Sequence, residues 1–171
     1  KNKPVLPKPS VNRIIQHRIA EKDFINKLNI RTTQYAPIEN KLQIEALQEL
    51  LPGILKTCTL GYDGKGQFVI NINEEVNKLE IEFDREYILE KKINLKKEIS
   101  IIVTRFQNND CLIFEPFENH HVNQMLSKSI TPADISKNIL EKAQQQSKLI
   151  AEKLDYVGTM CVEYFIDENN N

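Results

Sequence analysis

The chain has 171 residues with 40% hydrophobic and 27% charged residues, which is the composition of an ordinary globular protein. A chain of this length folds without a disulfide or metal staple. The near balance of 23 Lys and Arg with 24 Asp and Glu, a net charge of −1, excludes a nucleic-acid binder held by a strong basic field. No apolar run approaches the ~20 residues of a membrane helix. We therefore expect one domain, or two small lobes, of a cytoplasmic protein.

The cysteines and histidines argue against a metal or redox centre. Cys58, Cys111 and Cys161 lie far apart in apolar, strand-like runs, and no CxxC motif occurs. We expect buried structural thiols in a reducing compartment. The three histidines supply too few ligands at useful spacing for a His/Cys metal site.

The first half of the chain predicts a linker followed by mixed helices and strands. Three prolines within residues 1–10 predict an extended linker. Ser10 is placed to cap a helix from Val11 to about residue 28, where apolar residues recur every three to five positions, and Asn29 suits its end. The elements expected next are a strand at 33–38, a helix at 42–51, and strands at 54–59 and 67–72 around a glycine-rich turn.

The second half predicts a sheet with one long helix. We expect a short polar helix or loop at 73–77, strands at 86–93, 98–107, 111–117 and 125–129, and a last strand at 159–166. Thr131, Pro132 and Asp134 have the order of a helix start, which predicts a helix to about residue 155. The alternation of the last strand puts Val162, Tyr164 and Ile166 on one face and Cys161, Glu163 and Phe165 on the other. The order of these expected helices and strands predicts an α+β fold with mostly antiparallel strands, and not a fold of alternating βα units.

A glycine-rich loop at 61–67 is the strongest local candidate for a binding site. It holds three of the five glycines of the chain, Gly61, Gly64 and Gly66, between two expected strands. Glycine lets backbone N–H groups approach an anion closely, and Lys56 and Lys65 add positive charge. A hairpin that folds over phosphates and a plain glycine-rich hairpin both fit this pattern. A Walker loop does not, because GxxxxGK[ST] is absent.

Two further segments and one acidic residue have both a structural and a functional interpretation. Residues 89–98 fit a solvated connection between strands. They also fit a linker that pairs its N–H and C=O groups with an adenine edge, while Glu98 accepts from ribose hydroxyls. Glu163 is expected to face an interior or cleft, as part of a structural ion pair or as a Mg²⁺ ligand. Residues 118–121 are expected to form an exposed turn.

The order of these motifs closely resembles the ATP-grasp portion of the 5-(carboxyamino)imidazole ribonucleotide synthetase family, over about residues 11–167. The segments that carry the resemblance are 16–18, 21–24, 55–57, 61–67, 89–90, 98–105, 118–121, 129–133, 154–158 and 162–165. The sequence GYDGKGQ at 61–67, with Lys-Thr upstream at 56–57, is specific to this branch.

The resemblance implies an α+β ATP-grasp fold with mostly antiparallel sheets in two lobes with packed helices. It implies a linker at 1–10, a first lobe at 11–93 with a phosphate loop at 61–67 and a hinge at 90–93, and part of a second lobe at 94–171. The implied ATP contacts are Arg18, Lys56, Gly61, Tyr62, Asp63, Gly64, Lys65, Gly66, Gln67, Glu90, Lys91, Lys92, Ile93, Glu98 and His121. Tyr62, Asp63 and Lys65 are also implied to face aminoimidazole ribonucleotide, with Lys65 where the family often has Arg. Glu163 is implied to be a Mg²⁺ ligand.

The implied activity is that of an ATP-dependent carboxylating ligase of purine biosynthesis. Bicarbonate attacks the γ-phosphate of ATP to give carboxyphosphate, and carboxyphosphate or the CO₂ it releases carboxylates the exocyclic amine of the substrate. The implied partners are ATP, Mg²⁺, bicarbonate and aminoimidazole ribonucleotide, with a homodimer for the intact enzyme.

The family's upstream domain and its downstream Asn-Glu metal-binding segment are absent from the sequence, so we expect a fragment whose isolated activity is slow or lost. Two alternatives stay open. One is an ATP-grasp ligase of another substrate, and the other is an incomplete or decayed fragment that only binds nucleotide.

Overall fold

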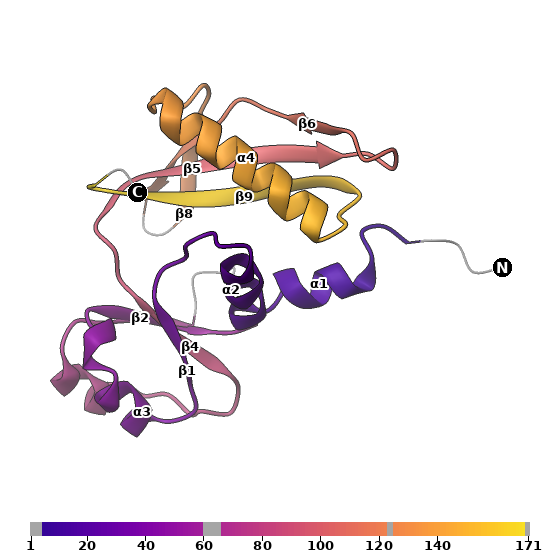
Figure 1. The fold of residues 1–171 in the computed structure, drawn as a ribbon. Helices are drawn as coiled ribbons and strands as arrows, with labels where there is room; N and C mark the ends of the chain where they lie inside the picture. The colour runs from indigo at the N-terminus through magenta and orange to yellow at the C-terminus, as the bar shows by residue number, and fades with distance from the viewer. Residues whose placement is uncertain (1–4, 60–65, 123–124, 170–171) are drawn as a thin grey trace. The chain divides into compact units, whose positions relative to one another are not determined.

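The fold is given by a computed structural model that describes residues 5–59, 66–122 and 125–169 (Figure 1). The chain divides into two compact units. Unit 1 consists of Lys1–Asn12 and Asn94–Asn171, and unit 2 consists of Arg13–Ile93. Each unit contains one antiparallel sheet, so the expectation of an α+β fold with mostly antiparallel strands is confirmed. In the described part of the chain no helix is long and apolar enough to cross a membrane.

Unit 2 is built on a four-stranded sheet in the order β1-β4-β2-β3. Its elements are helix α2 (Arg18–Lys27), strand β1 (Tyr35–Ile38), helix α3 (Lys41–Ala46), the 3₁₀ helix η1 (Gln48–Leu50), strands β2 (Gly53–Thr57) and β3 (Gln67–Ile70), the 3₁₀ helix η2 (Asn73–Lys78) and strand β4 (Tyr87–Lys91). All neighbouring strands in this sheet run antiparallel.

The two faces of this sheet have different roles because successive strand residues point to opposite sides. One face carries Leu55 and Leu89, which form a buried core with Ile44 of α3. The other face carries Lys56 and Glu90. Glu90 pairs with Ile54, so their side chains lie on the same face of the sheet. Lys56 is two residues after Ile54 on β2 and therefore also lies on that face. Alternation along β2 and β4 therefore separates the core of unit 2 from a charged face.

The long helix expected from Val11 to about residue 28 is in fact two helices, α1 (Pro9–Ile15) and α2. His17 interrupts it with an extended backbone conformation, φ −128° and ψ 111°, and its side chain accepts a hydrogen bond from the N–H of Ala20. His17 thus acts as the N-cap of α2, a role that the apolar periodicity does not reveal. Asn29, with φ 59°, confirms the expected end of this helical region.

Unit 1 is built around strand β5 (Leu95–Arg105), which has neighbours on both edges. Strand β9 (Gly158–Asp167) pairs with it along one edge from Leu95↔Asp167 to Arg105↔Gly158. Strands β6 (Cys111–Ile113) and β7 (Phe117–Val122) pair with opposite ends of the other edge, and β8 (Met125–Ile130) pairs with β7. Helix α4 (Lys137–Lys153) lies across β5 and β9 (Figure 1).

Helix α4 covers only one face of the unit 1 sheet. Ile99 and Ile101 of β5 pack there with Ala143 of α4 and Ile166 of β9 in a buried core. The expected alternation of β9 is confirmed, because Ile166 is buried in this core while Glu163 and Phe165 on the opposite face are exposed. The opposite face carries polar side chains from β5, β7 and β9.

Two expectations about this unit are wrong. Residues 118–121 belong to strand β7 and not to an exposed turn, and Pro116 separates β7 from the short β6. The long helix begins at Lys137 and not near Thr131, with Ser136 as its N-cap. The N–H of Ala133 donates to the carbonyl of Pro116 at 2.9 Å, which ties that segment to the sheet.

The prediction of three buried thiols is correct for one of them. Cys58 is 1% exposed, whereas Cys111 is half-buried and Cys161 is exposed on the open face of the unit 1 sheet. Burial raises the pKa of the Cys58 thiol to about 11, with a further contribution from the negative charge of Glu86. Cys58 is therefore a protonated structural thiol at neutral pH.

Candidate functional site

A buried carboxylate between two lysines is the central feature of the charged face of unit 2. The Lys56 Nζ lies 2.8 Å from Glu90 Oε2, and the Lys22 Nζ lies 3.5 Å from Glu90 Oε1. The side chains of Glu90, Lys56 and Lys22 are 8%, 14% and 15% exposed. This cluster carries a net positive charge in a region of low solvent access, which suits it to attract an anion.

The charges in this cluster shift the pKa values of its members. Burial alone would raise the pKa of Glu90, but the positive charges of Lys22 and Lys56 outweigh it and hold this pKa below its ordinary value of 4.5. Burial lowers the pKa of Lys22, and the charge of Lys56 lowers it further against the opposing effect of Glu90. Glu90 is thus ionised at neutral pH.

Arg18 lies at the end of β2, close to the start of the glycine-rich loop. Its Nε donates to the carbonyl of Thr57 at 3.1 Å, and its backbone N–H donates to the carbonyl of Cys58 at 2.9 Å. The structure therefore brings Arg18 to the strand that carries Lys56, as expected if both serve one site.

Two residues of the predicted phosphate loop are described. Gly66 has φ +82°, a conformation that favours glycine, and its carbonyl accepts from the N–H of Thr57 at 3.3 Å. Gln67 begins β3 and lies opposite Lys56 in the register. The other predicted loop residues lie outside the described residues: Gly61, Tyr62, Asp63, Gly64 and Lys65.

The predicted hinge at 90–93 continues strand β4 and ends at the boundary between the two units. The N–H of Lys91 donates to the carbonyl of Gln34, and the N–H of Lys92 donates to the carbonyl of Pro52, both at 2.8 Å. Lys91 and Lys92 can therefore offer a ligand their carbonyl groups and side chains, while their N–H groups are engaged within unit 2. Ile93 is half-buried.

The open face of the unit 1 sheet gathers a second set of polar residues. His121 Nε2 lies 3.7 Å from Glu98 Oε1, and Glu98 lies opposite Asn119 in the register. The Asn119 amide donates to Ser100 Oγ, and its Oδ1 accepts from Ser129 Oγ at 2.8 Å. These contacts form one connected polar surface over β5, β7 and β8.

Glu98 and Glu163 are close enough to influence each other. Burial raises the pKa of Glu98, and the negative charge of Glu163 raises it further, while His121 acts in the opposite direction. Glu163 lies opposite Ser100 and is exposed, so of the expected interior or cleft it does not face an interior. The alternative of a structural ion pair finds no partner for Glu163 in the described part of the chain.

Of these two carboxylates, Glu163 is the predicted Mg²⁺ ligand. Within residues 5–59, 66–122 and 125–169, no group of three or more His, Cys, Asp or Glu side chains could hold a metal ion. Mg²⁺, however, is often held by one or two carboxylates together with substrate phosphates. The donor set around Glu163 therefore fits Mg²⁺ that arrives with a nucleotide.

Sequence reasoning identified Lys56, Glu90, Glu98 and His121 but missed Lys22. Lys22 lies four residues after Arg18 on α2, a spacing that puts two residues on the same helix face. That spacing could have identified it as a neighbour of the predicted site.

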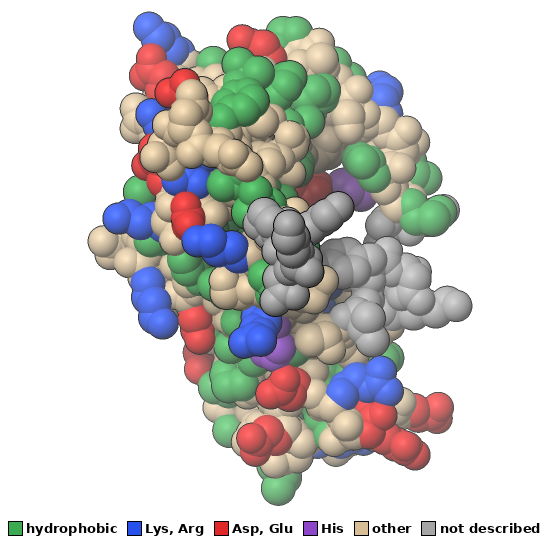
Figure 2. Space-filling model, turned by 90° about the vertical axis from the view of Figure 1, so that its right-hand side faces the viewer, with side chains coloured by type: hydrophobic (Ala, Val, Ile, Leu, Met, Phe, Trp, Pro, Cys, Tyr) green, Lys and Arg blue, Asp and Glu red, His purple; other side chains and the backbone are tan. Residues whose placement is uncertain are grey.

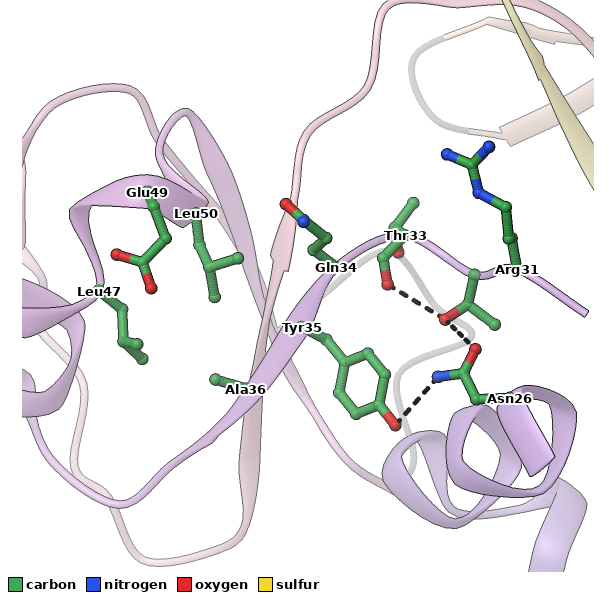
Figure 3. Close-up of a pocket in the computed structure, with 10 residues that line it drawn as sticks. Asn26, Arg31, Thr33, Gln34, Tyr35, Ala36, Leu47, Glu49 and Leu50 are labelled. Atoms are coloured by element: carbon green, nitrogen blue, oxygen red, sulfur yellow. Dashed lines mark hydrogen bonds between the residues drawn. The ribbon is translucent and has the colours of Figure 1, made fainter. Parts of the chain in front are cut away.

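A separate pocket of about 460 Å³ lies elsewhere in unit 2 (Figure 3). Its lining residues are Asn26, Arg31, Thr32, Thr33, Gln34, Tyr35, Ala36, Leu47, Glu49 and Leu50, none of which belongs to the predicted site. Two of them contact Lys22: Thr33 Oγ1 accepts from its Nζ at 2.9 Å, and the ring centre of Tyr35 lies 5.5 Å from that nitrogen.

Charged side chains outside these sites are mixed in sign. Figure 2 shows Lys and Arg interspersed with Asp and Glu over the face in view. Surface pairs such as Lys137 with Glu141 and Lys148 with Glu152 on α4 follow the helical i,i+4 spacing.

Comparison with known proteins finds matches over most of the chain. The N5-carboxyaminoimidazole ribonucleotide synthase of Staphylococcus aureus (strain MRSA252) is 36% identical over 161 residues, which are 92% of this chain and 42% of that protein. The synthase of Bacillus subtilis (strain 168) is 38% identical over 159 residues, which are 91% of this chain and 42% of that protein. The chain thus spans about 42% of the length of these relatives.

Solved structures agree with the sequence matches. The crystal structure of N5-carboxyaminoimidazole synthetase from Staphylococcus aureus complexed with ADP is 36% identical with a TM-score of 0.84, and the match covers 93% of this chain and 43% of that one. The family model described as the ATP-grasp domain matches residues 23–171. Because this family model covers most of the chain, the chain belongs to the ATP-grasp family.

Proposed function

We propose that the chain is the ATP-binding region of a ligase that carboxylates aminoimidazole ribonucleotide with bicarbonate and ATP in purine biosynthesis. The observation that carries this proposal is 36–38% identity to N5-carboxyaminoimidazole ribonucleotide synthases over 91–92% of the chain. The GYDGKGQ sequence at 61–67 and the cluster of Lys22, Lys56 and Glu90 are consistent with it.

The proposed phosphate contacts come from unit 2. Lys56 and Arg18 supply positive charge at the end of β2, and the loop residues 61–67 supply backbone N–H groups. Phosphoryl transfer asks a protein mainly for positioning and for neutralisation of charge on the phosphate oxygens. The described members of this set provide both.

The proposed adenosine contacts come from residues 90–93 and from the polar face of unit 1. In this proposal the backbone of residues 90–93 meets the adenine, Glu98 accepts from ribose hydroxyls and His121 contacts the nucleotide. The pairing of His121 with Glu98 at 3.7 Å holds the two side chains next to each other. Glu163 would hold Mg²⁺, which when bound neutralises charge on the phosphate oxygens.

The proposed reaction has two steps. An oxygen of bicarbonate attacks the γ-phosphorus of ATP, the bond to the bridging oxygen breaks, and ADP leaves with the electron pair. The exocyclic amine of aminoimidazole ribonucleotide then attacks the carbonyl carbon of carboxyphosphate, or of the CO₂ released from it. Inorganic phosphate leaves and one proton passes to water. Tyr62, Asp63 and Lys65 are the proposed substrate contacts and lie outside the described residues.

The experiment that tests this function combines binding with turnover. MgATP is titrated into the purified chain by calorimetry, and phosphate release is followed with bicarbonate and aminoimidazole ribonucleotide present and with each omitted in turn. We expect saturable MgATP binding. Phosphate release that requires both co-substrates would support the carboxylating ligase. Binding without such release would favour a nucleotide-binding fragment, and an absence of binding would overturn the proposal.

A further inference from the structure

We propose that Lys22 is a positioning residue that keeps Glu90 paired, so that Lys56 can leave Glu90 and contact a bound phosphate. This inference rests on the proposed function, in which Lys56 binds the phosphates of ATP. It assigns a role to a residue on α2 that is not among the predicted ATP contacts.

The geometry shows one carboxylate shared between two cations. Glu90 presents Oε2 to Lys56 at 2.8 Å and Oε1 to Lys22 at 3.5 Å. All three side chains are 15% exposed or less, so water cannot easily replace a lost partner. Removing the only partner of such a buried charge is strongly unfavourable.

The two lysines differ in how firmly they are held. Lys22 also donates to Thr33 Oγ1 at 2.9 Å and lies over the ring of Tyr35 at 5.5 Å, and both of these residues belong to the wall of the pocket in Figure 3. These contacts fix Lys22 beside Glu90. Lys56 lies on β2, the strand that leads into the glycine-rich loop, and among the described residues the one polar contact of its ammonium group is with Glu90. Lys56 is therefore the cation that can turn to a ligand, while Lys22 stays with the carboxylate.

With Lys22 present, Glu90 keeps a positive partner when Lys56 turns to a phosphate. Without Lys22, the same movement would leave Glu90 buried and unpaired, so Glu90 would hold Lys56 back and ATP affinity would fall. The burial that lowers the pKa of Lys22 also agrees with a lysine enclosed by protein groups.

A double-mutant cycle on the full chain tests this coupling. The dissociation constant of MgATP is measured by calorimetry for the wild type, Lys22→Met, Glu90→Gln and the double variant. We expect Lys22→Met to weaken binding about tenfold, within the range of a lost charged contact. In the Glu90→Gln background the same substitution is expected to change affinity by less than about twofold, because a neutral amide does not restrain Lys56.

Two further variants separate charge from local structure. Lys22→Arg keeps the positive charge and is expected to bind MgATP within about threefold of the wild type. Lys27→Met, on an exposed position of the same helix, is the matched control and is expected to leave affinity unchanged. Circular dichroism on each variant verifies folding.

Several results would overturn the proposal. If Lys22→Met leaves affinity unchanged, or weakens binding equally in both backgrounds, Lys22 does not act through Glu90. If Lys22→Met does not fold, the proposal is tested with Glu90→Gln alone, by measuring its affinity for inorganic tripolyphosphate. We expect Glu90→Gln to bind tripolyphosphate about threefold or more tightly than the wild type, because Lys56 is released from its carboxylate partner. An unchanged affinity would contradict the proposal. Failure of the proposed function is distinct: then Lys56→Ala would not weaken MgATP binding in any background.

Discussion

Lys56 is the residue of the charged face on which the proposed phosphate contact depends. It lies on β2 with its ammonium group 2.8 Å from Glu90, and the next strand begins at Gln67, opposite it in the register. In the proposed function, Lys56 would leave Glu90 to contact a phosphate oxygen of the bound nucleotide. The partner that Lys56 takes would then decide whether a phosphate binds to unit 2.

Substitution of Lys56 by alanine is expected to weaken MgATP binding by about 1.5–3 kcal/mol, the contribution of a charged hydrogen bond. Titration calorimetry measures this change directly. Lys27→Ala serves as the control, since Lys27 is exposed at the end of α2. Equal affinity in the Lys56→Ala and Lys27→Ala proteins would show that Lys56 does not touch the phosphates.

Glu163→Gln is expected to raise the Mg²⁺ concentration needed for half-maximal nucleotide binding by about fivefold or more, because an amide is a poorer Mg²⁺ ligand than a carboxylate. The measurement is a Mg²⁺ titration at fixed ATP. Glu141→Gln, on the exposed surface of α4, provides the control. A curve that superimposes on that of the control protein would mean that Glu163 is only a surface carboxylate.

At the scale of elements, the attachment of α4 to β9 depends on one buried hydrogen-bonded group. The Tyr164 hydroxyl lies 2.8 Å from Ser147 Oγ and donates to the carbonyl of Ala143 at 3.1 Å. Burial raises the pKa of the Tyr164 phenol to about 12, so the hydroxyl keeps its proton at every ordinary pH. Helix and strand are thus joined by polar contacts as well as by apolar packing.

Tyr164→Phe is expected to lower the free energy of unfolding by about 1–3 kcal/mol, because it leaves the buried Ser147 hydroxyl without this partner. Ser147→Ala is expected to cost less, since Tyr164 then keeps the Ala143 carbonyl. Urea unfolding of the two variants measures both values. The reverse order of stabilities would contradict this account of how α4 is attached.

The elements show which parts of the fold the sequence could reveal. Strands with apolar alternation, such as β9, were predicted with the correct faces because burial imposes a period of two. Strand β7 was missed because its residues 118–121 are polar and give no apolar alternation. The break at His17 was missed because the apolar spacing runs through it, and only the side-chain cap at Ala20 marks the boundary.

In the candidate site too, some residues have a signal in the sequence and others do not. Lys56, Glu90 and Glu98 stand in segments that carry the family resemblance, so the sequence alone predicts them as site residues. Lys22 and Asn119 have their roles only because strand pairing and helix packing bring them to Glu90 and Ser100. The helical spacing from Arg18 could have placed Lys22 near the predicted site, but its contact with Glu90, which is far away in the chain, has no local sequence signal.

At the scale of the whole molecule, stability at acid pH is expected to depend on Glu90. Its pKa in the folded chain is lowered below 4.5, so it stabilises the folded state above the unfolded pKa and loses this effect as pH falls through the folded pKa. One such group changes stability by up to about 1.4 kcal/mol per pH unit. We expect the free energy of unfolding to decrease as pH falls below about 4.5.

Urea unfolding at a series of pH values between 7 and 3 measures this dependence, with Glu90→Gln for comparison. Asp84 and Asp155 also have lowered pKa values, caused first by hydrogen bonds from Arg85 and Lys8, so some dependence is expected to persist in the variant. The slope for Glu90→Gln is expected to be shallower than that of the wild type. Identical slopes would rule out a charge-stabilising role for the Lys22, Lys56 and Glu90 cluster.

The long pairing of β5 with β9 has a consequence for how the protein is made. A ribosome releases the chain from its first residue onward, and the sheet of unit 2 has all its strands once Lys91 has emerged. Strand β5 follows at once, but the partner for one of its edges is Gly158–Asp167. From the synthesis of β5 until the synthesis of β9, one edge of β5 has no partner strand. Ile99 and Ile101 of the later core belong to this strand. We therefore expect the sheet of unit 1 to be completed only after β9 has been synthesised.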